Sequence, residues 1–322
     1  MKIKIMNKSQ SILGIGNAIV DVFAHVNENF LKKNNLIKGS MRLVTFDELN
    51  KIKNQVKIKK IQAGGSVANS MAGISYLNGK CSFIGKVNKD NFGSIYKKSL
   101  KKINVDFLHN AKKEKLATGT SLILITPDSE RTMCTYLGIS SQLNSDDIKE
   151  KHIKNRALVF LEGYLWDKGT AKKMFKKTIK IAKKNKVEVA MSLSDFFCVE
   201  RHKKDFVKLL KNDLNLLFGN EKEILELTNS KNLEKAMSKL KKINKLIIIT
   251  REKKGSLVIR GNYKTICKAN KVEKILDMTG AGDLFASGFL YEYLNNNNLE
   301  NCLKKGSLLA SKIIQKIGAR IH

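Results

Sequence analysis

Proline and tryptophan occur once each in this chain of 322 residues, and cysteine occurs five times. The cysteines are scattered and include no C-x-x-C pair, so neither a disulfide framework nor a thiolate zinc site is indicated. Long apolar segments are also missing, because the longest window without a charge, 61–79, holds four glycines together with serines and asparagines. Such a window is too polar for a membrane span. These absences favour a globular protein of the reducing cytoplasm with no membrane partner.

Acidic residues are few as well, since 29 Asp and Glu stand against 61 Lys and Arg, which gives a formal net charge of +32. A charge of this size is typical of nucleic-acid-binding proteins. The lysines, however, are spread along almost the whole chain, and aromatic residues do not alternate with them as a base-stacking surface requires. We therefore interpret the charge as a compositional bias carried by solvated faces, and we expect no nucleic-acid partner.

Apolar, β-branched runs alternate with amphipathic segments along most of the chain, which is the pattern of a parallel sheet covered by helices. In the segment 168–184, apolar residues fall on one helical face and lysines on the other. The asparagine run 295–298 is expected to be a loop between the last two helices. We predict one α/β domain over 1–322 with a mostly parallel central sheet. Its expected strands are 12–15, 82–84, 157–161, 187–191, 214–218 and 246–250.

Two segments break this alternation, 20–44 and 120–137, and we expect both to form antiparallel strands. The second contains the turn Pro127-Asp-Ser-Glu130. Strands inserted in this way suggest a small β-sheet lid formed by about 20–45 and 118–138. The start of the chain, 1–10, is basic and leads into an apolar run that resembles a signal peptide. Asn17 and Asp21 interrupt that run, so we interpret it as a buried strand.

The sharpest motif is Asp277-Met-Thr-Gly-Ala-Gly-Asp283, which leads directly into an apolar helix. Gly280 and Gly282 allow the backbone to approach a ligand closely, and the first free amides of a helix attract an anion. Asp283 either caps the helix and answers its dipole, or lies beside a bound phosphate as a base for an attacking hydroxyl. The spacing is compatible with both.

A second glycine turn, Gly64-Gly65, also opens a helix, with Asn69 one turn inside. The glycines leave room for a polar ligand, and an amide side chain offers both a donor and an acceptor to sugar hydroxyls. An ordinary tight turn has the same sequence. Other phosphate motifs are missing, because there is no G-x-x-x-x-G-K-[ST] and Gly14-Ile-Gly16 lacks the third glycine of the dinucleotide fingerprint.

In their order and distance, the two glycine turns resemble the signatures of the ribokinase-like, or PfkB, family of sugar and nucleoside kinases. The segments 16–21, 220–223, 250–255 and 318–320 add to the resemblance, which covers nearly the whole chain. It implies a ribokinase-like three-layer α/β/α domain with a small β-sheet lid. It also implies transfer of the γ-phosphate of ATP to a small-molecule hydroxyl acceptor, with Mg²⁺ as a cofactor.

The resemblance further implies roles for individual residues. Asp283 would be the general base, and the amides around Gly280, Ala281 and Gly282 would form the anion hole for the transferring phosphoryl group. The residues implied or considered for acceptor binding are Asp21, Gly64, Gly65, Asn69 and Glu162. Those implied for the nucleotide are Asn220, Glu223, Thr250, Gly255 and Arg131.

Two of these positions concern metal ions. Glu223 would bind Mg²⁺ through water. Asp277 is a candidate K⁺ ligand, because several family members bind potassium near the matching residue. Met278 replaces the first threonine of the common Asp-Thr-Thr-Gly form, which removes one hydroxyl beside the turn and leaves K⁺ binding open.

Several of these residues also have an ordinary structural explanation. Asp21 could be a turn or cap residue, and Glu223 a first-turn helix acid. Thr250 and Gly255 could be a strand end and a hairpin glycine, and Arg131 a solvated arginine of the lid hairpin. Lid closure could instead bring Arg131 to the phosphates.

The segments 161–167 and 192–202 look like those of bacterial family members grouped with adenosine kinases. This favours a nucleoside acceptor, adenosine above others, phosphorylated at its 5′-hydroxyl. A ribokinase- or fructokinase-type sugar kinase is the alternative. Family members occur both as monomers and as homodimers paired through the lid, and both states remain open for this chain.

Overall fold

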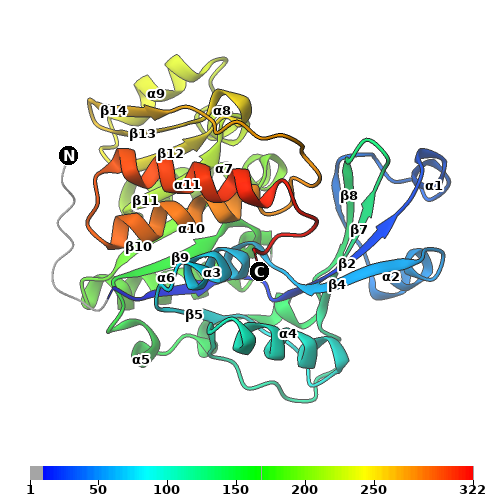
Figure 1. Ribbon diagram of the computed structural model, residues 1–322. Helices are drawn as coiled ribbons and strands as arrows, with labels where there is room; N and C mark the ends of the chain where they lie inside the picture. Colours follow the sequence, from blue (N-terminus) through cyan, green and yellow to red (C-terminus); the bar gives the residue numbers. More distant parts are fainter. Residues whose placement is uncertain (1–9, 168, 322) are drawn as a thin grey trace.

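The computed structural model describes residues 10–167 and 169–321 (Figure 1). The basic start of the chain, which belongs to the run that resembles a signal peptide, lies outside the described residues. Lys168, the first residue of the helix expected over 168–184, lies outside them as well. None of the helices in the described part combines the length and the apolar character needed to cross a lipid bilayer.

A large sheet of nine strands forms the centre of the molecule, in the order β14-β13-β12-β11-β10-β9-β1-β5-β6. The strands from β12 to β6 are parallel, and β13 and β14 are antiparallel at one edge. The six predicted strands are confirmed to within two residues. The nine strands are β1 (Ile12–Ile15), β5 (Cys81–Ile84), β6 (Asp106–Phe107), β9 (Leu158–Glu162), β10 (Glu188–Ser192), β11 (Leu216–Asn220), β12 (Leu246–Thr250), β13 (Ser256–Arg260) and β14 (Tyr263–Cys267).

Helices cover both faces of this sheet, so the predicted three-layer architecture is confirmed. Both faces of the central strands are apolar: Ile12 of β1 packs into one core and Leu13 into the other. The first core lies under α3 (Ser66–Tyr76), α4 (Asn91–Lys102), α10 (Ala281–Leu294) and α11 (Leu299–Ile313). The second core lies under α5 (Glu150–Ile153), α6 (Ala171–Lys184), α7 (Phe196–Asn212), α8 (Glu221–Thr228) and α9 (Leu233–Lys241).

A second, small sheet projects from one end of the large one, on the right in Figure 1. Its order is β3-β8-β7-β2-β4, and α1 (Glu28–Lys33) and α2 (Phe46–Lys53) lie beside it. The five strands are β2 (Ile19–His25), β3 (Met41–Leu43), β4 (Ile58–Ala63), β7 (Gly119–Ile125) and β8 (Arg131–Tyr136).

The expected antiparallel pairing of this sheet is wrong in part. β7 and β8 are antiparallel, as predicted, but β2 pairs in parallel with β7 and β3 pairs in parallel with β8. The reason is that α1 lies between β2 and β3 and carries the chain across to the far edge of the sheet. β4 pairs antiparallel with β2 and lies outside both predicted lid segments.

Candidate active site

A cavity of about 450 Å³ lies where the large sheet meets the small one. The last residues of four neighbouring strands, Glu162, Ser192, Asn220 and Thr250, all line it. Ligands bind at this edge in open α/β sheets. The predicted site residues on the cavity wall are Asp21, Gly65, Asn69, Arg131, Glu162, Asn220, Glu223, Thr250, Gly280, Ala281, Gly282 and Asp283.

The N-terminus of α10 opens into this cavity without a side-chain cap. Its N-cap is Gly280, with φ +77°, and no side chain of the described residues bonds to the first amides. Side chains cap α2, α4, α7, α8, α9 and α11. A Cβ at Gly282 would meet nothing within 4 Å. The Ala281 amide donates to the Met278 carbonyl at 3.3 Å, so the amides of Gly282 and Asp283 and the positive end of the helix dipole form an anion-binding surface on the cavity wall.

Asp283 is bound by the other glycine turn rather than by its own helix. Its Oδ1 accepts a hydrogen bond from Ser66 Oγ at 2.7 Å, and its Oδ2 accepts one from Asn69 Nδ2 at 3.0 Å. Asp283 therefore does not cap α10, although it lies in the first turn, where an acid interacts favourably with the helix dipole. Burial raises the pKa of Asp283, while these two hydrogen bonds and two nearby arginines lower it. The result is a carboxylate held beside the amides of α10.

The Gly64-Gly65 turn is pressed against the neighbouring backbone and against Asp21. Gly65 is the N-cap of α3 with φ +91°, and a Cβ there would lie 2.2 Å from the carbonyl oxygen of Asn17. A Cβ at Gly64 would lie 2.1 Å from Asp21 Oδ2. Gly64 thus stands behind Asp21 rather than on the cavity wall, and both positions require glycine.

Asp21 lies in the middle of β2, so it is neither a turn residue nor a cap. Its side chain is 5% exposed and lines the cavity. No side chain or amide among the described residues donates a hydrogen bond to its carboxylate. Burial raises the pKa of Asp21 to about 7, and the charge of Arg320 opposes that rise. Asp21 is therefore a buried acid whose hydrogen-bonding capacity is available to a ligand.

Glu162 is buried at the end of β9 and is occupied by protein donors. Its Oε1 accepts from the backbone and side-chain nitrogens of Asn17, both at 2.8 Å, and its Oε2 accepts from the Val67 amide at 3.1 Å. Burial raises the pKa of Glu162 to about 7, and the bonds from Asn17 and Val67 lower it. Glu162 thus joins the segment before β2 to the start of α3.

Arg131 connects the small sheet to the glycine turn before α10. Its Nη1 donates to Thr279 Oγ1 at 2.7 Å, and its Nε lies 3.4 Å from Asp277 Oδ1. The interpretation of Arg131 as a solvated arginine is therefore wrong. Asp277 is 1% exposed and also accepts from the amides of Thr279 and Gly318. Asp277 supports the loop from behind and does not line the cavity.

Asn220 and Glu223 form a reciprocal cap at the start of α8. Asn220 Oδ1 accepts from the Glu223 amide at 2.9 Å, and both nitrogens of Asn220 donate to the Glu223 carboxylate. Burial raises the pKa of Glu223 to about 7. The pair also lines the cavity, where carboxylate and amide oxygens suit a hydrated Mg²⁺ ion.

Thr250 and Gly255 were predicted together, but the structure separates them. Thr250 lies on the cavity wall at the end of β12. Gly255 has φ +82°, and a Cβ there would lie 2.1 Å from the carbonyl oxygen of Cys267. It belongs to the turn before β13, as the structural explanation of a hairpin glycine expected, and it is absent from the cavity lining.

Arg320 is a site residue for which no sequence motif predicts a role. It is 3% exposed, and its Nε donates to Asn69 Oδ1 at 3.1 Å. In the sequence, the segment 318–320 contributes only to the family resemblance. No local pattern indicates that an arginine near the end of the chain returns to the start of α3.

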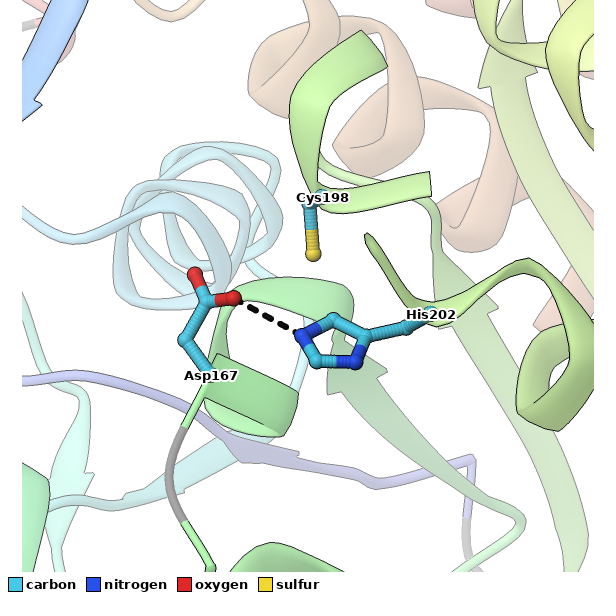
Figure 2. Close-up of side chains that lie close together, drawn as sticks. All are labelled: Asp167, Cys198 and His202. Atoms are coloured by element: carbon cyan, nitrogen blue, oxygen red, sulfur yellow. Dashed lines mark hydrogen bonds and ion pairs between the residues drawn. The ribbon is translucent and has the colours of Figure 1, made fainter. Parts of the chain in front are cut away.

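A second cluster of polar side chains is formed by Asp167, Cys198 and His202 (Figure 2), of which Asp167 also lines the cavity. Asp167 accepts from His202 Nε2 at 2.8 Å and from Arg201 through two bonds of 2.9 and 2.8 Å. Burial raises the pKa of Cys198, which favours the thiol. The Asp167 carboxylate is thus occupied by a histidine and by a bidentate guanidinium, whose positive charge disfavours a cation at this position.

The buried acids predict a pH-dependent stability. Asp21, Glu162 and Glu223 have pKa values raised to about 7, whereas in the unfolded chain they titrate near pH 4. The folded protein therefore binds more protons between these values, and stability falls as the pH rises through about 7. We expect a lower Tm at about pH 8 than at about pH 6 in calorimetry without ligands. The difference should shrink in Asp21→Asn, and an unchanged difference would contradict this account.

The fold and the cavity together define a kinase. The chain belongs to the pfkB family of carbohydrate kinases, whose family model matches residues 32–322. Its fold is the ribokinase-like α/β fold with a large, mostly parallel sheet and a second small sheet. It is thus a phosphotransferase with a hydroxyl acceptor, and the family implies ATP and Mg²⁺ as cofactors.

Known proteins similar to this chain include kinases of different acceptors. An adenosine kinase from Sinorhizobium meliloti is 35% identical, with a TM-score of 0.93 over 97% of this chain and 96% of that one. A probable sugar kinase from Rhizobium etli CFN 42 is 33% identical, with a TM-score of 0.93 over 98% and 96%. A 5-dehydro-2-deoxygluconokinase from Clostridium beijerinckii is 27% identical over 83% of this chain and 82% of its own length.

Proposed function

We propose that this chain transfers the γ-phosphate of ATP to the 5′-hydroxyl of a nucleoside, adenosine above other acceptors. The observation that supports a nucleoside acceptor is an apolar wall on the small-sheet side of the cavity. It is formed by Ile19, Met41, Leu43, Ile123, Met133 and Leu137. A purine base buries apolar surface against such a wall, whereas a free polyhydroxylated acid has no comparable group to place there.

Polar groups beside this apolar wall suit the ribose. Asp21 is buried without a protein donor and can accept hydrogen bonds from ribose hydroxyls. Asp283 lies on the same cavity beside the N-terminus of α10. An acceptor anchored at Asp21 can direct its primary hydroxyl toward Asp283, which takes the proton as the oxygen attacks phosphorus.

The remaining chemistry is electrostatic, because phosphoryl transfer has a loose, anionic transition state. The amides of Gly282 and Asp283, at the start of α10, are proposed to hold the equatorial oxygens of the moving group. Magnesium, when bound, neutralises charge on the phosphate oxygens, and Asn220 and Glu223 would hold it through water. Arg131 ties the small sheet over the turn, and the resulting closure excludes water that would compete as an acceptor.

The comparisons support this proposal unequally. The similarity to the Sinorhizobium meliloti adenosine kinase covers nearly the whole of both chains at 35% identity. The similarity to 5-dehydro-2-deoxygluconokinases favours the second candidate, a sugar kinase, at 27% identity over less of the chain. A ribokinase- or fructokinase-type enzyme belongs to this second candidate.

The test is an ATP-consumption assay with Mg²⁺ across adenosine, inosine, guanosine, ribose, fructose and 5-dehydro-2-deoxygluconate. We expect adenosine to have the highest kcat/KM, because only nucleosides place a base on the apolar wall. Met133→Gln, which makes that wall polar at similar volume, should raise the KM for adenosine about tenfold and leave the KM for ATP unchanged. A higher kcat/KM for a free sugar or sugar acid would replace the nucleoside with the second candidate.

A further inference from the structure

Arg320 lies buried behind both glycine turns, close to the end of the described chain. Its Nη1 donates to Ser99 Oγ at 3.2 Å, and its Nη2 donates to the carbonyl oxygen of Gly64 at 3.4 Å. Its Nε donates to Asn69 Oδ1 at 3.1 Å. Burying a guanidinium is costly unless it is paired. These contacts therefore place the buried positive charge of Arg320 next to Asn69, one of the residues that bind the Asp283 carboxylate.

The contact with Asn69 decides which way the Asn69 amide points. Arginine can only donate, so the amide oxygen faces Arg320 and the amide nitrogen faces Asp283 Oδ2, at 3.0 Å. The reversed amide would set its NH₂ group against the guanidinium and its oxygen against the carboxylate. Both contacts of the reversed amide are repulsive. Arg320 thus fixes a chain of hydrogen bonds that ends on the Asp283 carboxylate.

Charged groups on several elements surround Asp283. Arg320 and Arg131 lower its pKa, from the chain end and from β8. The negative charge of Asp283 in turn raises the pKa of Asp21 on β2 and of Glu162 at the end of β9. Arg131 belongs to the small sheet and contacts Thr279 and Asp277, whereas Arg320 is bonded within the α3 side of the site.

We infer that Arg320 is a positioning residue for phosphoryl transfer, because it orients the Asn69 amide that holds the Asp283 carboxylate in place. This role rests on the proposed function of Asp283 as the base. Arg320 does not line the cavity, so it acts through Asn69 and contacts no reacting atom. Its charge also helps to keep the base in the ionised form that accepts a proton.

The test compares Arg320→Ala and Arg320→Lys with the wild type, on whichever acceptor the wild type uses. For Arg320→Ala we expect kcat to fall about 10- to 100-fold with the KM for ATP changed less than about threefold. The acidic limb of the kcat/KM profile should move to higher pH. Guanidinium at millimolar concentration should restore part of the activity. Lysine should keep much of the pH profile but recover less kcat, because it keeps the charge without the planar donor.

Ser99→Ala is the matched control, since it removes a bond to Arg320 on the side away from Asn69. It should leave kcat and the pH profile unchanged. A purely structural role for Arg320 would lower Tm in Arg320→Ala without a shifted pH profile or rescue by guanidinium, and that result would overturn the inference. If Arg320→Ala does not fold, Arg320→Lys tests the planar donor alone: a lower kcat at unchanged Tm supports the inference, and a wild-type kcat overturns it.

A readout independent of turnover separates this inference from the proposed function. Carbon-13 NMR of labelled aspartate carboxyls, assigned by the loss of a signal in Asp283→Asn, measures the pKa of Asp283 directly. We expect that pKa to rise in Arg320→Ala, to rise less in Arg320→Lys, which keeps the charge, and to stay the same in Ser99→Ala. A wild type inactive on every acceptor would refute the proposed function alone, whereas an unmoved Asp283 pKa would refute the inference alone.

Discussion

Replacing Asp283 with asparagine is expected to lower kcat roughly 10²- to 10⁴-fold while ATP binding stays largely intact. Asparagine has nearly the same shape and can still accept the hydrogen bond from Ser66, but it cannot take the proton of the acceptor hydroxyl. The α10 amides and the Asn220–Glu223 pair are untouched by the change. Steady-state kinetics gives the loss in kcat, and titration calorimetry with ATP and Mg²⁺ gives the nucleotide affinity.

Glu300→Gln is the control for this variant. Glu300 is also an acid in the first turn of a helix, but it lies on α11, exposed and paired with Lys304. The same loss of a carboxylate at that position should leave both kcat and ATP affinity unchanged. Wild-type turnover in Asp283→Asn would remove Asp283 from the role of base and with it the proposed mechanism.

The large sheet could be predicted from the sequence because its strands are apolar on both faces. Ile12–Ile15 is buried on both sides, and such runs stand out between helices of period 3.6. The small sheet was harder. Each residue of β2 pairs with a residue of β7 that lies 100 positions later in the chain, and no local signal specifies this partner. β4 was missed because Lys59 and Lys60 interrupt its apolar pattern.

The same division holds for the site. The glycine turns could be recognised because backbone at positive φ and close approach require glycine at Gly65 and Gly280. The hydrogen-bond partners of the site side chains could not be predicted, because they come from distant parts of the chain. The bond between Arg320 and Asn69 spans 251 residues, and the bond between Ser66 and Asp283 spans 217. The position of Asp283 in the sequence is compatible with a helix cap. Only the tertiary contacts with Ser66 and Asn69 of α3 show that its carboxylate is bound elsewhere.

Gly65→Ala is expected to cost more than about 2 kcal/mol of stability and most of the activity. A side chain at φ +91° is strained by itself. The added Cβ would also lie 2.2 Å from the carbonyl oxygen of Asn17, which is backbone and cannot rotate away. The turn must therefore move, and Ser66 moves with it, away from Asp283. Thermal unfolding measures the first loss and acceptor kinetics the second.

Gly282→Ala is the comparison for Gly65→Ala, because it adds a methyl group to the other glycine turn at a position with no neighbouring atoms. Gly282 does not have a positive φ, and a Cβ there meets nothing within 4 Å, so the fold should tolerate alanine or gain slightly from its helix propensity. The methyl group would nevertheless stand in front of the free amides of α10, and we expect the KM for ATP to rise at least about tenfold with Tm unchanged. Unaltered ATP binding in Gly282→Ala would mean that the phosphates lie elsewhere. Asp283 would then have no electrophile beside it, however well α3 holds its carboxylate.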